Sequence, residues 1–227
     1  MFALRIAQAM LGGIALTLLP AQAAPPVLAG ATFVVDPGHG TRYRDGRELN
    51  VGAVGAHGVL ERTVVLGVGE DVARLLRQDG ARVVLTRSYA RPFRTATILR
   101  LDNRARAALA NRLHATAFVA IHADASPDAG RRGTSVFWLR PNSLTLARAM
   151  RRRLRSLDFG EAEFRARDLA VTSEARVPAV LVEIGFVSNA AQALQLSRPH
   201  VRERIAEAIV AALRDTFADS RDGTGGD

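Results

Sequence analysis

Residues 32–40 read Thr-Phe-Val-Val-Asp-Pro-Gly-His-Gly. The first four are β-branched or aromatic, which predicts a short buried strand that stops at the Asp-Pro-Gly sequence. Pro37 cannot donate to a sheet ladder, and Gly38 and Gly40 permit backbone angles that other residues avoid. The pattern places His39 on a tight, exposed turn at the carboxyl end of the first strand. Open α/β sheets build their sites at that edge. A turn histidine without any role is the alternative.

Downstream of this stretch, strand and helix patterns alternate. Residues 41–58 are rich in glycine and charge and predict a long loop. The run at 117–123 is almost continuously apolar, as expected of a central parallel strand buried on both faces. The sequence therefore predicts a single-domain α/β fold, with a central, mostly parallel twisted sheet of about five to six strands and helices on both faces. The other expected strands are 82–86, 133–139, 168–172 and 178–186, and the expected helices are 61–78, 99–113, 143–157, 190–196 and 199–217.

The composition is that of an ordinary soluble globular protein, with 48% apolar and 23% charged residues in a chain of 227. No cysteine occurs, which excludes disulfides, thiolate zinc sites and a lipid-bearing cysteine. A formal net charge of +9 raises the question of nucleic acid. The arginines are spread along the chain without interleaved aromatic residues, so we expect no nucleic-acid partner. A basic surface also suits an anionic polymer such as a bacterial cell wall.

The first residues predict an export signal. Arg5 gives a positive start, residues 6–19 are mostly apolar, and residues 21–23 read Ala-Gln-Ala, a small-x-small cleavage site. The expected organisation is a signal peptide at 1–23, a linker at 24–30, a catalytic domain at 31–217 and a disordered tail at 218–227. An uncleaved anchor is the alternative, but the apolar run is shorter than the roughly 20 residues of a membrane span. We expect a periplasmic or secreted protein without a stable membrane span.

Four side chains are candidates for chemistry. His39 and His122 each follow or end a core strand, Glu61 opens the helix 61–78, and Glu183 interrupts the apolar strand 178–186. Two histidines and one glutamate form a known catalytic zinc set, and a further carboxylate can move the proton of a water molecule during amide hydrolysis. Structural alternatives are a helix-dipole role for Glu61 and a buried ion pair between Glu183 and an arginine.

Several sequence blocks occur in a known order: Asp36 to Gly40, Gly52 to Glu61, Leu85-Thr86-Arg87, Ala110-Asn111, Ile121 to Asp124, Gly133-Thr134 and Pro178 to Asn189. In these blocks the chain resembles the zinc-dependent N-acetylmuramoyl-L-alanine amidases, the periplasmic amidases of cell separation, over about residues 32–217. The resemblance implies cleavage of the amide between the lactyl group of N-acetylmuramic acid and the L-alanine of the stem peptide in peptidoglycan. It also implies one Zn²⁺ per chain on His39, Glu61 and His122, with Glu183 as the catalytic carboxylate. Arg106 and Asn111 would be substrate-binding, or Arg106 structural.

The chain departs from the family pattern in several places. The loop at 41–50 is longer than usual, and Ala90 replaces a common acidic residue. His57 is an extra imidazole, expected to be exposed or to support the Glu61 ligand. The connection from Leu139 to Asp168 looks too short for the inserted helix that blocks the zinc in some relatives. We therefore expect no autoinhibition of that kind, although a protein activator remains a candidate partner.

Two other functions compete with an amidase. A zinc peptidase acting on stem peptides would use the same His, Glu, His ligands. A non-catalytic wall-binding protein would retain the fold alone, but such proteins normally lose a ligand or the catalytic carboxylate, and all four residues are present here.

Overall fold

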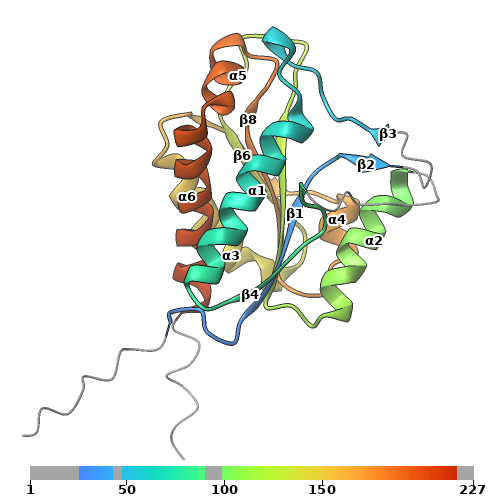
Figure 1. The fold of residues 1–227 in the computed structure, drawn as a ribbon, viewed down its shortest axis with the longest axis vertical. Coiled ribbons are helices and arrows are strands. Elements are labelled where there is room, and N and C mark those ends of the chain that lie inside the picture. Colours follow the sequence, from blue (N-terminus) through green and yellow to red (C-terminus); the bar gives the residue numbers. More distant parts are fainter. Residues whose placement is uncertain (1–25, 43–47, 90–98, 219–227) are drawn as a thin grey trace, which may run out of the picture.

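The computed structural model describes residues 26–42, 48–89 and 99–218. The expected signal peptide, Ala90 and nearly all of the expected tail lie outside these ranges. The described chain forms one α/β domain around a six-stranded sheet (Figure 1). The strands lie in the order β4 (Arg82–Leu85), β1 (Thr32–Pro37), β5 (Ala117–Asp124), β8 (Ala179–Phe186), β6 (Thr134–Trp138) and β7 (Glu161–Ala166). The expected fold class is confirmed.

Most of the sheet is parallel. β4, β1, β5 and β8 run in one direction, whereas β6 pairs antiparallel with β8 and β7 pairs parallel with β6. The carboxyl ends of β1, β5 and β8 therefore meet at one edge of the sheet. The beginning of β6, not its end, lies at that same edge beside β8.

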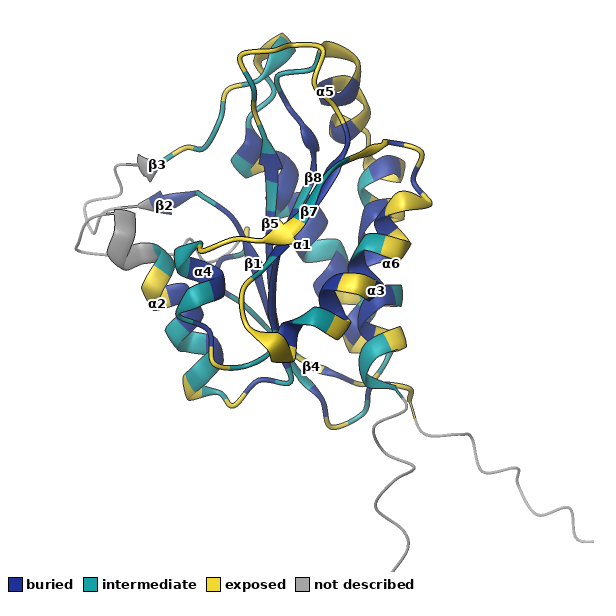
Figure 2. Cartoon of the chain, turned by 180° about the vertical axis from the view of Figure 1, so that it is seen from behind, coloured by how far each residue is buried: buried dark blue, intermediate teal, exposed yellow. Residues whose placement is uncertain are grey.

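Helices cover both faces of the sheet (Figure 1, Figure 2). One face carries α1 (Glu61–Gln78), α3 (Leu144–Arg155) and α6 (Pro199–Phe217), and the other carries α2 (Leu99–Arg112) and α4 (Ala170–Ser173). The short helix α5 (Ala190–Ser197) precedes α6, and single 3₁₀ turns occupy Ala56–Gly58 and Pro141–Ser143. No helix in the described part of the chain is long and apolar enough to cross a membrane.

The alternation along β5 decides which side chains reach the site. Val119 and Ile121 pack into the larger core under α1 and α6, and Phe118 and Ala120 pack into the smaller core under α2 and α4. Because successive side chains of a strand point to opposite faces, His122 continues the row of Phe118 and Ala120. His122 therefore lies on the α2 and α4 side of the sheet, at the carboxyl end of β5.

The expected fifth strand at 168–172 is wrong. The strand is β7, and residues 170–173 form the short helix α4 instead. β7 reads Glu-Ala-Glu-Phe-Arg-Ala, so small or apolar residues do alternate with charged ones as in an edge strand. The charged residues find partners on neighbouring elements, with Glu161 paired to Arg151 and Glu163 paired to Arg131, each at 2.6 Å.

Two other segments are more ordered than expected. The expected loop at 41–58 contains a small antiparallel pair of strands, β2 (Thr41–Arg42) and β3 (Glu48–Asn50), before the 3₁₀ turn. Part of the expected linker belongs to the domain, because Leu28 is fully buried and its N–H donates to the carbonyl of Asp79 at 2.9 Å. Residues 26–30 therefore close the bottom of the larger core.

Candidate metal centre

Three predicted ligands converge at the carboxyl edge of the sheet. β1 and β5 are parallel neighbours, which brings His39, just past β1, next to His122 on β5, and α1 begins with Glu61 beside them. Glu61 Oε1 lies 2.8 Å from His39 Nε2 and 3.2 Å from His122 Nδ1, and the two nitrogens are 3.1 Å apart. Ligand bonds of about 2.0–2.1 Å in a tetrahedral zinc site place ligand atoms about 3.3 Å apart, close to these separations. The donor set therefore fits a zinc ion.

His39 is fixed from its other nitrogen and from its backbone. Its Nδ1 lies 2.8 Å from Asn50 Oδ1, an acceptor, so Nδ1 carries the proton and Nε2 is left free for a metal. The residue itself has φ of 61°, a left-handed conformation that few non-glycine residues adopt. Its side chain is only 19% exposed, so the expected exposed turn is in fact largely covered. Asn50 was not singled out from the sequence.

Glu61 is held by the chain around it. The N–H groups of Ala53 and Ala123 donate to its two carboxylate oxygens at 2.9 and 3.1 Å. Burial alone would raise the pKa of Glu61, but the hydrogen bonds to His122 and His39 outweigh it and hold the pKa well below its ordinary value. The carboxylate is therefore ionised at neutral pH, as a metal ligand must be.

Glycine is required at two positions around the cluster. A Cβ on Gly52, which has φ of +71°, would lie 2.8 Å from both Glu61 Oε2 and His39 Cγ. A Cβ on Gly38 would come within 2.4 Å of the His122 ring. The close approach of backbone to ligand side chains, rather than turn conformation alone, explains the glycine at 38.

A buried arginine lies directly beneath the cluster. Arg106 is 1% exposed, and it donates to Asp36 Oδ1 at 2.6 Å, to the carbonyl of His39 at 3.0 Å and to Thr41 Oγ1 at 2.9 Å. Burial would raise the pKa of Asp36, but Arg106 and the hydrogen bond from Thr86 lower it below the ordinary value. Arg106 thus holds the His39 turn from beneath, and its side chain is buried.

A second arginine clamps the same turn from the other side. Arg87 donates to the carbonyls of Pro37, Gly38 and Arg62 at 2.8, 2.6 and 2.8 Å. It therefore joins the His39 turn to the first turn of α1, which carries Glu61. Arg87 lies in the Leu-Thr-Arg block, but nothing in the sequence alone assigns this residue a role.

Glu183 lies beside the cluster on β8. It stands opposite His122 on β5 and opposite Ser135 on β6, so the three side chains share one face of the sheet. Its Oε2 is buried and has no hydrogen-bond partner among the described residues, and the same holds for Ser135 Oγ. Burial, followed by the negative charges of Asp124 and Glu61, raises the pKa of Glu183 well above its ordinary value. The alternative of a buried ion pair with arginine is wrong for the described part of the chain, where Glu183 has no such partner.

The remaining sequence candidates lie apart from the cluster. The Asn111 amide donates to the carbonyl of Glu174 at 2.9 Å and accepts from the N–H of Arg176 at 2.7 Å, so it holds the connection between α4 and β8 and does not join the metal ligands. His57 is exposed in the 3₁₀ turn, as expected. The connection from 139 to 168 consists of a 3₁₀ turn, α3 and β7, and α3 packs against α6 on the opposite face from Glu183.

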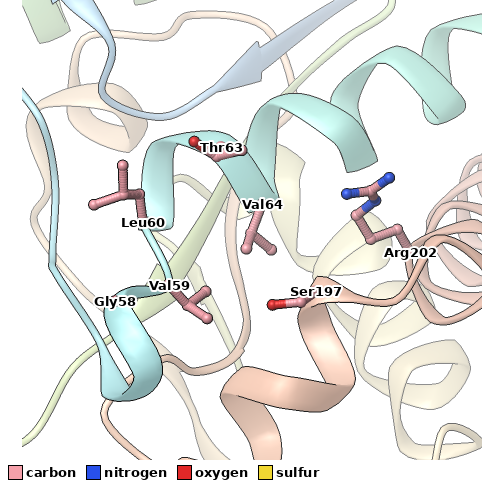
Figure 3. Close-up of a pocket in the computed structure, with 7 residues that line it drawn as sticks. All are labelled: Gly58, Val59, Leu60, Thr63, Val64, Ser197 and Arg202. Carbon is pink, nitrogen blue, oxygen red and sulfur yellow. The ribbon is translucent and has the colours of Figure 1, made fainter.

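A separate pocket of about 280 Å³ lies where the start of α1 meets the junction of α5 and α6 (Figure 3). It has an apolar wall and one arginine, and no metal ligand lines it. Its lining residues are Gly58, Val59, Leu60, Thr63, Val64, Ser197 and Arg202.

The chain is similar to known proteins in sequence and in structure. Residues 33–215 match the family described as N-acetylmuramoyl-L-alanine amidase. YqiI of Bacillus subtilis (strain 168) is 34% identical over 213 residues, covering 91% of this chain and 94% of YqiI. "Probable cell wall amidase LytH" of Staphylococcus epidermidis is 27% identical over 192 residues, covering 84% of this chain but only 60% of LytH. The solved structure of N-acetylmuramoyl-L-alanine amidase AmiC2 of Nostoc punctiforme superposes with a TM-score of 0.71 at 28% identity, covering 82% of this chain and 97% of that one.

Proposed function

The chain belongs to the N-acetylmuramoyl-L-alanine amidase family, and from this premise we propose that it is a zinc-dependent peptidoglycan hydrolase. It would cleave the amide between the lactyl group of N-acetylmuramic acid and the L-alanine of the stem peptide. The observation that carries the proposal is the convergence of His39 Nε2, Glu61 Oε1 and His122 Nδ1 at one point beside Glu183.

His39, Glu61 and His122 would hold one zinc ion per chain. When bound, zinc supplies Lewis-acid activation of water and of the scissile carbonyl. The ligand side chains are preorganised, because Asn50 fixes the His39 tautomer and the N–H groups of Ala53 and Ala123 orient the Glu61 carboxylate.

Glu183 would move the proton. As general base its carboxylate accepts a proton from the attacking water, and as general acid it then delivers that proton to the nitrogen of the leaving L-alanine. A general base works best when its pKa lies near the operating pH, and burial beside other carboxylates shifts the pKa of Glu183 in that direction. The buried and unpartnered Oε2 leaves Glu183 without a competing protein hydrogen bond at that atom.

Product analysis tests the reaction. Purified sacculi would be digested with the mature protein alone, and the soluble products identified by mass spectrometry, with a chelator control. Free stem peptides that begin at L-alanine, absent after chelation, are the expected result. Shortened peptides still attached to muramic acid would indicate a zinc peptidase instead. Zinc binding without any product would indicate a wall-binding role or the need for an activator, and would contradict the expected absence of autoinhibition.

Export is part of the proposal. The relative LytH is named as a probable cell wall amidase, and a peptidoglycan substrate lies outside the cytoplasm. The leader at 1–23 would direct the protein to the periplasm, and the mature chain would begin at Ala24. Amino-terminal sequencing of the protein from the periplasmic or secreted fraction checks this, and a chain that retains Met1 would support an uncleaved anchor.

Asn50→Ala is expected to lower zinc affinity by about 10- to 100-fold, because partners of ligating histidines set the tautomer and the ring orientation. Competition with a chromophoric chelator measures the affinity. Asn142→Ala is the matched control, since Asn142 is exposed and hydrogen-bonds only near the opposite end of the sheet, to Ser143 and to the carbonyl of Arg176. Equal zinc affinity in the Asn50→Ala variant and the unmodified protein would show that the 2.8 Å contact does not orient His39.

A further inference from the structure

The row of site residues continues beyond Glu183 to the edge of the sheet. Ser135 on β6 stands opposite Glu183 on one side and opposite Glu163 on the other. One step along β6 on the same face, Phe137 stands opposite Leu181 and Arg165. Figure 2 shows that the residues of β7, which forms this edge, are either exposed or partly buried. A surface therefore extends from the catalytic carboxylate across β6 to β7.

Three arginines lie on this surface, but only one of them is free. Arg131 and Arg165 both pair with Glu163, each at 2.6 Å. The exposed Arg167 lies just past the end of β7, with its guanidinium 5.0 Å from the centre of the Phe137 ring. Its side chain makes no hydrogen bond or ion pair with any described residue. Glu163 thus partly neutralises Arg131 and Arg165 and leaves the Arg167 charge without an ion-pair partner among the described residues.

Arg167 is also positioned relative to the catalytic carboxylate. Phe137, on which it stacks, neighbours Ser135 on the same face, and Ser135 stands opposite Glu183. Stacking on an aromatic ring holds the plane of a guanidinium while its N–H groups remain available for a bidentate carboxylate.

The proposed substrate offers only one kind of anionic group to the Arg167 guanidinium, a free carboxylate. The sugars of the glycan carry neutral N-acetyl and hydroxyl groups, and the lactyl carboxyl is consumed in the scissile amide. Free carboxylates occur in the stem peptide, on the leaving side of that amide. We propose that Arg167 is a specificity-determining residue that binds a free carboxylate of the leaving stem peptide. This inference rests on the amidase function proposed above.

The test uses two muramoyl tripeptides that differ only in whether the stem carboxylates are free or amidated. For the unmodified protein, kcat/KM is expected to be about 5- to 20-fold higher for the free acid, the range of one charge-assisted contact at a partly exposed site. Arg167→Gln is expected to lower kcat/KM for the free acid to the level of the amide, mainly through KM, and to leave the amide unchanged. Arg167→Lys would retain part of the preference, because it keeps the charge but loses the planar fork.

Arg148→Gln is the matched control, because it removes one exposed positive charge from α3 on the other face of the sheet. It is expected to keep the full preference. An acid preference that survives in Arg167→Gln, or an equal loss on both substrates, would overturn the inference while the amidase function stands. If the unmodified protein releases peptide from neither tripeptide nor from sacculi, the proposed function fails as well.

Discussion

Glu183→Gln is expected to lower amidase turnover by about 10²- to 10⁴-fold, because glutamine can neither accept the proton of water nor return it to the leaving nitrogen. Zinc content is expected to stay at one ion per chain, since Glu183 does not contribute to the His39, Glu61 and His122 cluster. Turnover on sacculi and metal content by atomic emission are the two measurements. Loss of both together would indicate that the variant had disturbed the cluster instead of the proton transfer.

The same substitution is expected to stabilise the metal-free protein at neutral pH. The folded-state pKa of Glu183 is raised above its unfolded value, so the fold disfavours the ionised form. The resulting loss of stability is absent below the unfolded pKa, begins as pH rises through it, and is complete above the folded pKa. Glutamine does not ionise, so the variant does not lose this stability. Each unit by which the folded-state pKa exceeds the unfolded-state pKa corresponds to about 1.4 kcal/mol of stability. In a chain of this size, 1 kcal/mol shifts Tm by about 2–4 °C.

The comparison is made by thermal unfolding between pH 4 and pH 8 in the presence of a chelator. The difference in Tm between Glu183→Gln and the unmodified protein should grow with rising pH. Glu174→Gln provides the control, because Glu174 forms an exposed pair with Arg104 and should show no such trend. A variant that is less stable than the unmodified protein at pH 8 would contradict the assignment of Glu183 as a buried, unpaired acid.

The fold and the convergence of His39, Glu61, His122 and Glu183 could be predicted because each leaves a local signal. The apolar run of β5 specifies a strand buried on both faces, and a histidine or glutamate within or just after such a run has few structural explanations. Parallel strands then bring His39, His122 and Glu183 to one edge without any further information. The helical period from 61 to 78 likewise fixes Glu61 in the first turn of α1.

The supporting residues could not be predicted because their partners are distant in sequence. Asn50 contacts His39 only through the way that the 41–58 segment folds back, and Arg87 reaches three backbone carbonyls that no sequence pattern reveals. Strand β7 could not be predicted for a different reason. Its small or apolar positions alternate with charged residues that pair with arginines on neighbouring elements, and in sequence such residues look like a surface loop.

The second large effect concerns the buried arginine beneath the cluster. Arg106→Met is expected to destabilise the fold by about 3–5 kcal/mol, because it leaves the Asp36 carboxylate buried without its cation. Tm should fall by roughly 10 °C at neutral pH. Arg104→Met, two residues earlier on α2, removes an exposed pair with Glu174 and should cost less than about 1 kcal/mol. Urea unfolding of both variants measures the difference directly.

The dependence on pH separates an ion-pair effect from a packing effect. The pKa of Asp36 is lowered in the fold, so the stability that Asp36 contributes is present above its unfolded pKa and is lost as pH falls through the folded pKa. Without Arg106, burial raises the same pKa, and ionised Asp36 becomes destabilising as pH rises. The difference in the free energy of unfolding between Arg106→Met and the unmodified protein should therefore be largest near pH 7 and become smaller toward pH 4. Adding Asp36→Asn to Arg106→Met should recover part of the lost stability. A stability difference that does not change with pH, together with no recovery in the double variant, would contradict this. Arg106 would then act through packing and through its hydrogen bonds to the His39 turn, and not through its charge.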